Sequence, residues 1–159
     1  MATDMFLKLD GIKGESKDDK HKDEIDISSW SWGMSQTGTF GTGGGGGAGK
    51  VSFHDISISK NVDKATPELM LRCANGKHIS EGLLTVRKAG ENPVDYLKLK
   101  LTDILISSVQ HGGGGEIVSE SVTLNFGKVN LEYQQQGANG KADGGPVGMG
   151  WDLAANKKA

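Results

Sequence analysis

Apolar and polar residues alternate along much of this chain, and in four places the alternation shifts by one residue. The apolar residues before and after each shift are Ile25 and Ile27, then Trp30, Trp32 and Met34; Val51 and Phe53, then Ile56 and Ile58; Leu97, Leu99 and Leu101, then Ile104 and Ile106; Val122, Leu124 and Phe126, then Val129, Leu131 and Tyr133. Side chains on a strand alternate between its two faces, so a one-residue shift moves the apolar set to the other face.

A β-bulge or a sharp bend absorbs such a shift, and both occur where long strands turn the corner of a barrel. The four shifts therefore favour a closed barrel or a tightly bent sandwich, and we predict a mainly β fold, a compact β-barrel of mostly antiparallel strands. The alternative is that each shift is a short connection between two separate strands. Residues 6–10 are a further strand candidate, whereas the charged residues 15–24 are expected to form a solvated loop.

One short α-helix is expected to pack on the side of this barrel. Thr66 is placed to cap its first turn, Pro67 suits that turn, and Asn75 with Gly76 supplies a left-handed stop. Leu69 and Cys73 lie four residues apart and would share the buried face, with Cys73 as a small buried hydrophobe rather than a nucleophile. A helix of roughly eight residues needs such packing to be stable.

Length and charge restrict the function classes. The 159 residues fit one domain, 1–159, and the net charge of −2 comes from both signs mixed along the chain. Without a basic stripe, no nucleic-acid partner is expected. No stretch reaches the roughly 20 apolar residues of a membrane-spanning helix, so no membrane insertion is expected. The beginning of the chain does not read as a secretory signal, and a single cysteine fits a reducing, cytoplasmic compartment.

A glycine-rich segment gives the strongest hint of chemistry. Residues 44–50 read GGGGAGK and match the first seven positions of the phosphate-binding loop. That motif continues with Ser or Thr and opens a helix, whereas Val51 stands here and begins a strand-like stretch. We therefore expect neither nucleotide binding nor any other cofactor, and the chain is not expected to be an enzyme.

The histidines do not form a metal site either. His21, His54, His78 and His111 lack the spacing of metal ligands with one another, with cysteine or with carboxylates. His21 lies in the charged stretch and His111 precedes a glycine turn, so both are expected at the surface. No catalytic or metal-binding residue can be named.

Several short segments resemble one protein family in their order and spacing. They are residues 5–9 (MFLKL), 14–16 (GES), 29–33 (SWSWG), 49–51 (GKV), 66–67 (TP), 76–78 (GKH), 84–90 (LTVRKAG), 122–126 (VTLNF) and 150–152 (GWD). Across essentially its whole length the chain resembles the haemolysin-coregulated protein (Hcp) family of the type VI secretion system, and SWSWG and TVRKAG are the more specific motifs.

The resemblance implies a β-barrel with one side helix that assembles as a homo-hexameric ring. Rings of this family stack into the inner tube of a phage-tail-like injection machine, alongside spike and sheath components, and carry or stabilise effector proteins in the lumen. Such proteins are made in the cytoplasm and leave the cell with the tube. The alternative functions are a monomeric β-barrel that binds a small molecule or carbohydrate, and an enzyme that uses the glycine loop.

Two candidate sites follow for a tube protein. If Trp30 and Trp32 point into the core, Ser31 between them points the other way, toward the lumen if its strand lines the ring, or otherwise toward the outer wall. The uncharged loop 40–49 is expected to protrude and contact the next ring. The residues of this ring-stacking loop are Phe40, Thr42, Gly43, Gly44, Gly45, Gly46 and Gly47.

Overall fold

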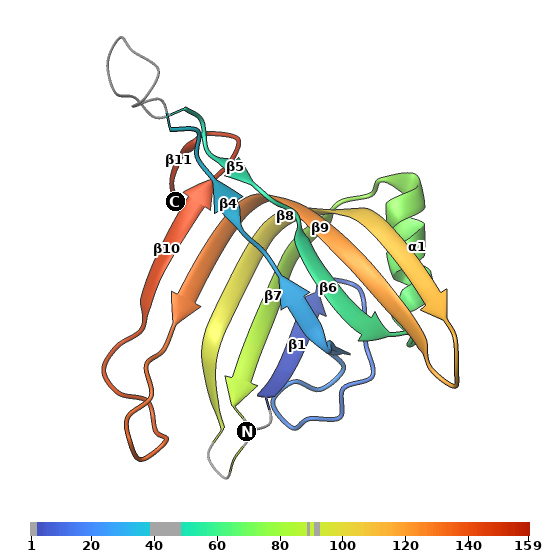
Figure 1. Ribbon diagram of the computed structural model, residues 1–159, viewed down its shortest axis with the longest axis horizontal. Helices are drawn as coiled ribbons and strands as arrows, with labels where there is room; N and C mark the ends of the chain where they lie inside the picture. Colours follow the sequence, from blue (N-terminus) through green and yellow to red (C-terminus); the bar gives the residue numbers. More distant parts are fainter. Residues whose placement is uncertain (1–2, 39–48, 89, 91–92) are drawn as a thin grey trace.

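Two long antiparallel strands, joined by a tight turn, are the framework of the computed structural model (Figure 1). The structure describes residues 3–38, 49–88, 90 and 93–159. Its elements are β1 (Thr3–Leu9), β2 (Ile25–Asp26), β3 (Ser29–Ser31), β4 (Met34–Ser35), β5 (Ser52–Phe53), β6 (Ile56–Asn61), α1 (Thr66–Asn75), β7 (Ile79–Lys88), β8 (Val94–Gly113), β9 (Val118–Tyr133), β10 (Val147–Asp152) and β11 (Lys157–Lys158).

Strands β8 and β9 bend together at one level. Asp103 of β8, which lies opposite Gly127 of β9, adopts a left-handed backbone conformation with φ of 59°. Aspartate tolerates that conformation better than most residues. The buried positions change from odd to even numbers in β8 and from even to odd in β9 at this point. Each of the last two phase shifts is therefore a bend within one long strand, as the alternation predicted, and the two bends form one corner that both strands share.

Strands β8 and β9 have different neighbours on the two sides of this corner. On one side, β7 pairs with the first part of β8 and β10 pairs with the last part of β9. On the other side, β6 pairs with the first part of β9. Strand β1 extends the first layer beyond β7, and β3 extends the second beyond β6. The hairpin thus belongs to two packed layers at once.

Residues 25–31 complete the hydrogen-bonded circuit. Their first part, β2, pairs with β1, and their last part, β3, pairs with β6. Between them, the Ile27 amide donates to the Met5 carbonyl (3.1 Å) and the Ser28 amide to the Ser59 carbonyl (2.8 Å). The first phase shift is therefore the point where the chain passes from one layer to the other, and the predicted antiparallel barrel is confirmed.

The second phase shift has the simpler explanation. Among the described residues, strand β5 pairs only with β4, in a separate two-stranded ribbon, and His54 and Asp55 connect β5 to β6. Here the shift is a short connection between separate strands, and no single strand bends.

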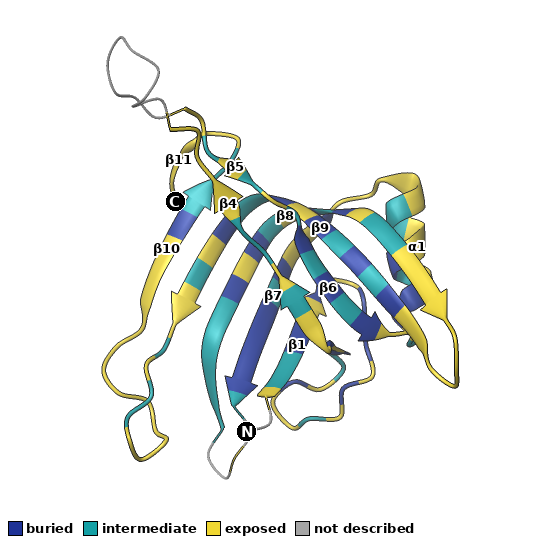
Figure 2. Ribbon diagram, in the orientation of Figure 1, coloured by how far each residue is buried: buried dark blue, intermediate teal, exposed yellow. Residues whose placement is uncertain are grey.

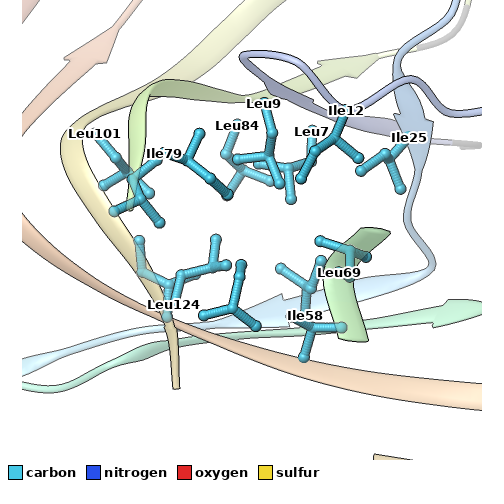
Figure 3. Close-up of a cluster of buried hydrophobic side chains, with 14 of the residues drawn as sticks. Leu7, Leu9, Ile12, Ile25, Ile58, Leu69, Ile79, Leu84, Leu101 and Leu124 are labelled. Carbon is cyan, nitrogen blue, oxygen red and sulfur yellow. The ribbon is translucent and has the colours of Figure 1, made fainter. Parts of the chain in front are cut away.

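Buried aliphatic side chains fill the space between the layers. Figure 3 shows Leu7, Leu9 and Leu84 on one side of the core, facing Ile58 and Leu124 on the other. Leu69 of α1 is fully buried against the same cluster. The helix therefore closes one side of the core.

The helix ends as predicted but begins differently. Gly76 adopts the left-handed conformation (φ 66°) and its amide donates to the Arg72 carbonyl (3.0 Å), as expected of a glycine stop. Thr66 was predicted to cap the first turn, but it is the first helical residue, and the capping position belongs to Ala65. The Thr66 hydroxyl turns inward instead, toward Glu120 (3.2 Å). Cys73 is only partly buried and packs against the core.

Candidate functional site

Ser31 lies on the outward face of the second layer. It is exposed in β3 and pairs with Ser57 of β6. Its neighbours Trp30 and Trp32 are partly buried and pack against the core. Trp32 stacks on Phe53 with ring centroids 6.0 Å apart, so the aromatic pair holds the end of β3 against the barrel.

Hydroxyl groups cover this outward face across four strands. Ser31, Ser57 and Thr123 lie side by side on β3, β6 and β9, and a second row contains Ser29, Ser59 and Ser121. Their sequence neighbours Ile56, Ile58, Val122 and Leu124 are buried on the opposite face. We define the hydroxyl face as these residues and their neighbours on β8: Ser29, Ser31, Ser57, Ser59, Ser107, Ser108, Ser121 and Thr123.

A β-bulge in β8 links the hydroxyl face into a network. The register shifts between Ile106 and Ser108, so Ser107 is the extra residue, and Ser107 and Ser108 both lie within hydrogen-bond distance of the Thr123 hydroxyl (2.7 and 2.6 Å). At the border of this face, the Asp55 carboxylate accepts from Ser107 (2.6 Å) and from Asn125 (2.9 Å). These bonds fix the orientation of short side chains that would otherwise rotate freely.

The first layer presents a different outward face. Lys98 lies opposite Glu132, and Lys100 approaches Glu81 at 4.0 Å. Lys8 of β1 and Lys128 of β9 also point outward, because their neighbours Leu7, Leu9 and Val129 are buried in the core. The barrel therefore has one charged wall and one uncharged wall, and the uncharged wall can hold a partner by hydrogen bonds and shape but offers little long-range attraction.

The predicted ring-stacking loop, Phe40 and Thr42 with Gly43, Gly44, Gly45, Gly46 and Gly47, lies outside the described residues. Strands β4 and β5 lead to it as a ribbon that extends away from the barrel (Figure 1). At the base of the loop the Gly49 amide donates to the Thr37 carbonyl (3.2 Å). Lys50 is soon followed by strand β5, as expected, and not by the helix that a phosphate-binding loop opens.

One of the two histidines expected at the surface is buried instead. His21 is 6% exposed, whereas His111, which lies in β8 and 2.6 Å from Glu120, is exposed as predicted. His54 is exposed, and His78 contacts Asp103 at the surface (2.9 Å). Within the described residues, no group of three or more His, Cys, Asp or Glu is arranged to hold a metal ion.

A buried ion pair that sequence reasoning missed lies beside α1. The Lys60 ammonium and the Glu120 carboxylate are fully buried and 2.6 Å apart. Lys60 also donates to Asp63 (2.9 Å), and His111 contacts the second Glu120 oxygen (2.6 Å). Burial alone would raise the pKa of Glu120, but the hydrogen bonds from Lys60 and His111 outweigh it, and the pKa is lowered. The pair ties β6 to β9 close to the start of α1.

At the opposite end of β9 the core face of the first layer is left uncovered. Val147 lies opposite Tyr133 and Met149 opposite Leu131, on the same face as the buried Val129. Val147 is 66% exposed, Tyr133 42% and Met149 40%. Figure 2 shows the beginning of β10 and the end of β9 as exposed. We call Leu131, Tyr133, Val147 and Met149 the apolar flange.

Comparison with known proteins confirms the resemblance found in the sequence. The family model described as "Type VI secretion system effector, Hcp" matches residues 6–133. Protein hcp1 of Pseudomonas aeruginosa is 55% identical over 162 residues, an alignment that covers 100% of each chain. The chain belongs to the Hcp family. As an Hcp protein it is a tube subunit of the type VI secretion system, and the monomeric ligand-binding barrel is not favoured.

Solved structures agree with this assignment. Hcp1 from Salmonella typhimurium is 40% identical with a TM-score of 0.81, and the match covers 100% of both chains. A structure described as a type six secretion system protein is 31% identical with a TM-score of 0.92, over 99% of this chain and 100% of that one. Among the described residues of this Hcp protein, no helix has the length and apolar character needed to span a membrane.

Proposed function

We propose that this Hcp protein closes into hexameric rings, which stack into a tube and carry effector proteins in a lumen lined by the hydroxyl face. In this proposal the protein has no catalytic activity and needs no cofactor. It is assembled in the cytoplasm, contacts spike and sheath components, and is secreted with the tube. Membership of a type VI secretion family supports the route, and the two unlike walls of the barrel support the orientation.

The apolar flange is the main support for the proposed ring. Its side chains lie on the face that elsewhere packs into the core, but here Val147 and Tyr133, which lie opposite each other, remain exposed. A contiguous exposed apolar surface favours a protein partner, because covering it releases ordered water. A second copy of the chain is the partner that a tube subunit always has nearby.

A ring also needs a second, different surface on the other side of the subunit. A heterologous contact that repeats around an axis joins one patch to another, and it closes if the rotation fits. Exposed apolar residues gather at the other end of β9, where Ile117 is 65%, Val118 46% and Val62 42% exposed. The Val62 amide donates to the Val118 carbonyl (3.0 Å), which holds this second patch together.

The orientation follows from the chemistry of the walls. Fixed charges on a lumen wall would bind cargo of opposite charge and repel the rest, so a carrier of different effectors is better served by uncharged hydroxyls. The charged wall with Lys98, Lys100 and Glu132 would then face outward. Ser31 lies at the edge of the hydroxyl face, with a small hydroxyl that leaves room for cargo.

Ser31→Gln is expected to crowd the lumen and weaken effector retention while ring assembly stays largely unchanged. Each ring would carry six enlarged side chains at one level, so a single substitution becomes a belt around the cargo. The measurement is co-purification of a co-expressed effector of the same secretion system with rings of equal mass. Lys98→Gln on the charged wall is the matched control, and equal recovery with wild type and Ser31→Gln would remove Ser31 from the cargo surface.

Deletion of residues 42–47 is expected to leave rings intact but to abolish tube formation. The segment is uncharged and rich in glycine, so ordering it costs conformational entropy that only new contacts can offset. Ring mass is measured by light scattering and tube formation by electron microscopy. Loss of the folded subunit on deletion would show that the loop is needed for the fold and not for stacking.

A further inference from the structure

Residues 11–24 form a strap that covers part of the charged wall. Beneath it lie Phe6, Thr85 and Arg87, all buried although they point outward from β1 and β7. The strap is held to itself by backbone bonds, among them the Gly14 amide to the Asp23 carbonyl (2.8 Å). Most charged side chains of this stretch are exposed, but Ser16 and His21 are buried, so the expectation of a solvated loop holds only in part.

The strap is fastened by ionic contacts at one point. Asp18 accepts from both terminal nitrogens of Arg87 (3.0 and 2.5 Å), and Asp4 of β1 accepts from Arg87 as well (3.1 Å). The hydrogen bonds from Arg87 hold the pKa of Asp18 well below its usual range. Asp18 therefore stays ionised throughout the neutral range, and this contact does not change with pH there.

His21 fastens the strap at a second point. Its ring stacks on Phe6 with centroids 4.3 Å apart and planes 9° apart. Its Nδ1 lies 2.9 Å from a Glu24 oxygen and its Nε2 lies 3.4 Å from an Asp95 oxygen of β8. Ionised carboxylates only accept hydrogen bonds, so the ring makes both hydrogen bonds only when both of its nitrogens donate, and only the imidazolium form has two N–H groups.

We propose that His21 is a proton-dependent latch: its imidazolium form holds the strap closed over Phe6, and loss of one proton releases the strap from β8. Glu24 from the strap and Asp95 from β8 contact the ring, and Asp18 of the strap lies near it while pairing with Arg87 of β7, which also pairs with Asp4 of β1. This inference does not depend on the ring or on its cargo.

Hydrogen–deuterium exchange of the assembled protein tests the latch. Exchange is followed at pH 5.5 and 8.5, on either side of the range in which histidines ordinarily titrate, and corrected for the intrinsic change in rate. Strap amides such as Gly14, Ser16 and Asp23 are expected to lose about tenfold in protection at the higher pH, the size of one charge-assisted hydrogen bond. Amides of β9 are expected to keep theirs.

Two variants make the test specific. Asp95→Asn offers both an acceptor and a donor to the ring, so neutral His21 also keeps its partner, and the strap should stay closed at both pH values. His21→Phe keeps the stack on Phe6 without a proton, and its strap should be equally protected at both. Equal wild-type protection at the two pH values, an equal loss in β9, or full pH dependence in Asp95→Asn would each overturn the proposal.

Discussion

Glu120→Gln is expected to lower the free energy of unfolding by about 3 kcal/mol, because it leaves the buried Lys60 ammonium without its closest carboxylate. Asp63 remains 2.9 Å from Lys60, which keeps the loss toward the low end for a broken buried pair. Chemical denaturation at one fixed protein concentration measures the effect, since association would itself add to stability. Glu116→Gln, an exposed glutamate before β9, is the matched control and should change little.

The same residue predicts how stability responds to acid. Since the folded-state pKa of Glu120 is lowered, its contribution is complete at neutral pH and is lost as the pH falls through that folded value. Glu120→Gln should lack this acid-sensitive component. The paired variant with Lys60→Met and Glu120→Leu should recover most of the loss, because no buried charge is left unpaired. If the paired variant is as unstable as Glu120→Gln, packing and not charge explains the effect.

Val147→Asp is expected to abolish the ring at micromolar concentration and to leave the subunit folded. The side chain is 66% exposed in the subunit, so aspartate is tolerated there, but in a ring it would bury an unpaired charge in the apolar flange. Light scattering gives the mass, and circular dichroism reports the fold.

Leu71→Asp provides the control for this change, because Leu71 is 52% exposed on α1 and lies outside both proposed contact patches. It should leave the mass of the ring unchanged. A ring that survives Val147→Asp, or one that Leu71→Asp breaks equally well, would remove the flange from the subunit contact.

The barrel could be predicted because each bend of its long strands appears in the local alternation of apolar and polar residues. The shift from Leu101 to Ile104 and the shift from Phe126 to Val129 are each visible within a few neighbouring residues. That the two shifts coincide at Asp103 and Gly127 depends on strand register, which the hydrophobic pattern of one strand alone does not specify. The shift before Ile56 has the same pattern but is a connection between two strands. The periodicity of apolar residues alone does not distinguish a bend within a strand from a turn between strands.

The hydroxyl face and the buried ion pair arise from the same alternation as the barrel, but they involve its polar residues, whereas the barrel was predicted from the apolar ones. Ser57 and Ser59 fill the gaps between Ile56, Ile58 and Lys60, and Lys60 continues the buried phase. A lysine in a buried phase predicts a partner of opposite charge. Its partner, Glu120, is 60 residues away, and only the pairing of β6 with β9 brings the two together.

The strap escaped prediction for a different reason. A charged segment ordinarily lies in solvent, and residues 15–24 contain no apolar period that would indicate packing. The strap instead contacts the barrel through an aromatic stack and a polar contact of His21 and through the ion pair of Asp18. Such contacts depend on partners far along the chain, Arg87 and Asp95, which local patterns do not reveal.

The mass of the wild-type protein in solution tests the central claim most directly. Six copies of the 16.8 kDa chain weigh about 101 kDa, and size-exclusion chromatography with light scattering separates this value clearly from that of one chain. The proposed ring predicts a hexamer at micromolar concentration. A monomer at every concentration tested would contradict it, and the apolar flange would then need another partner.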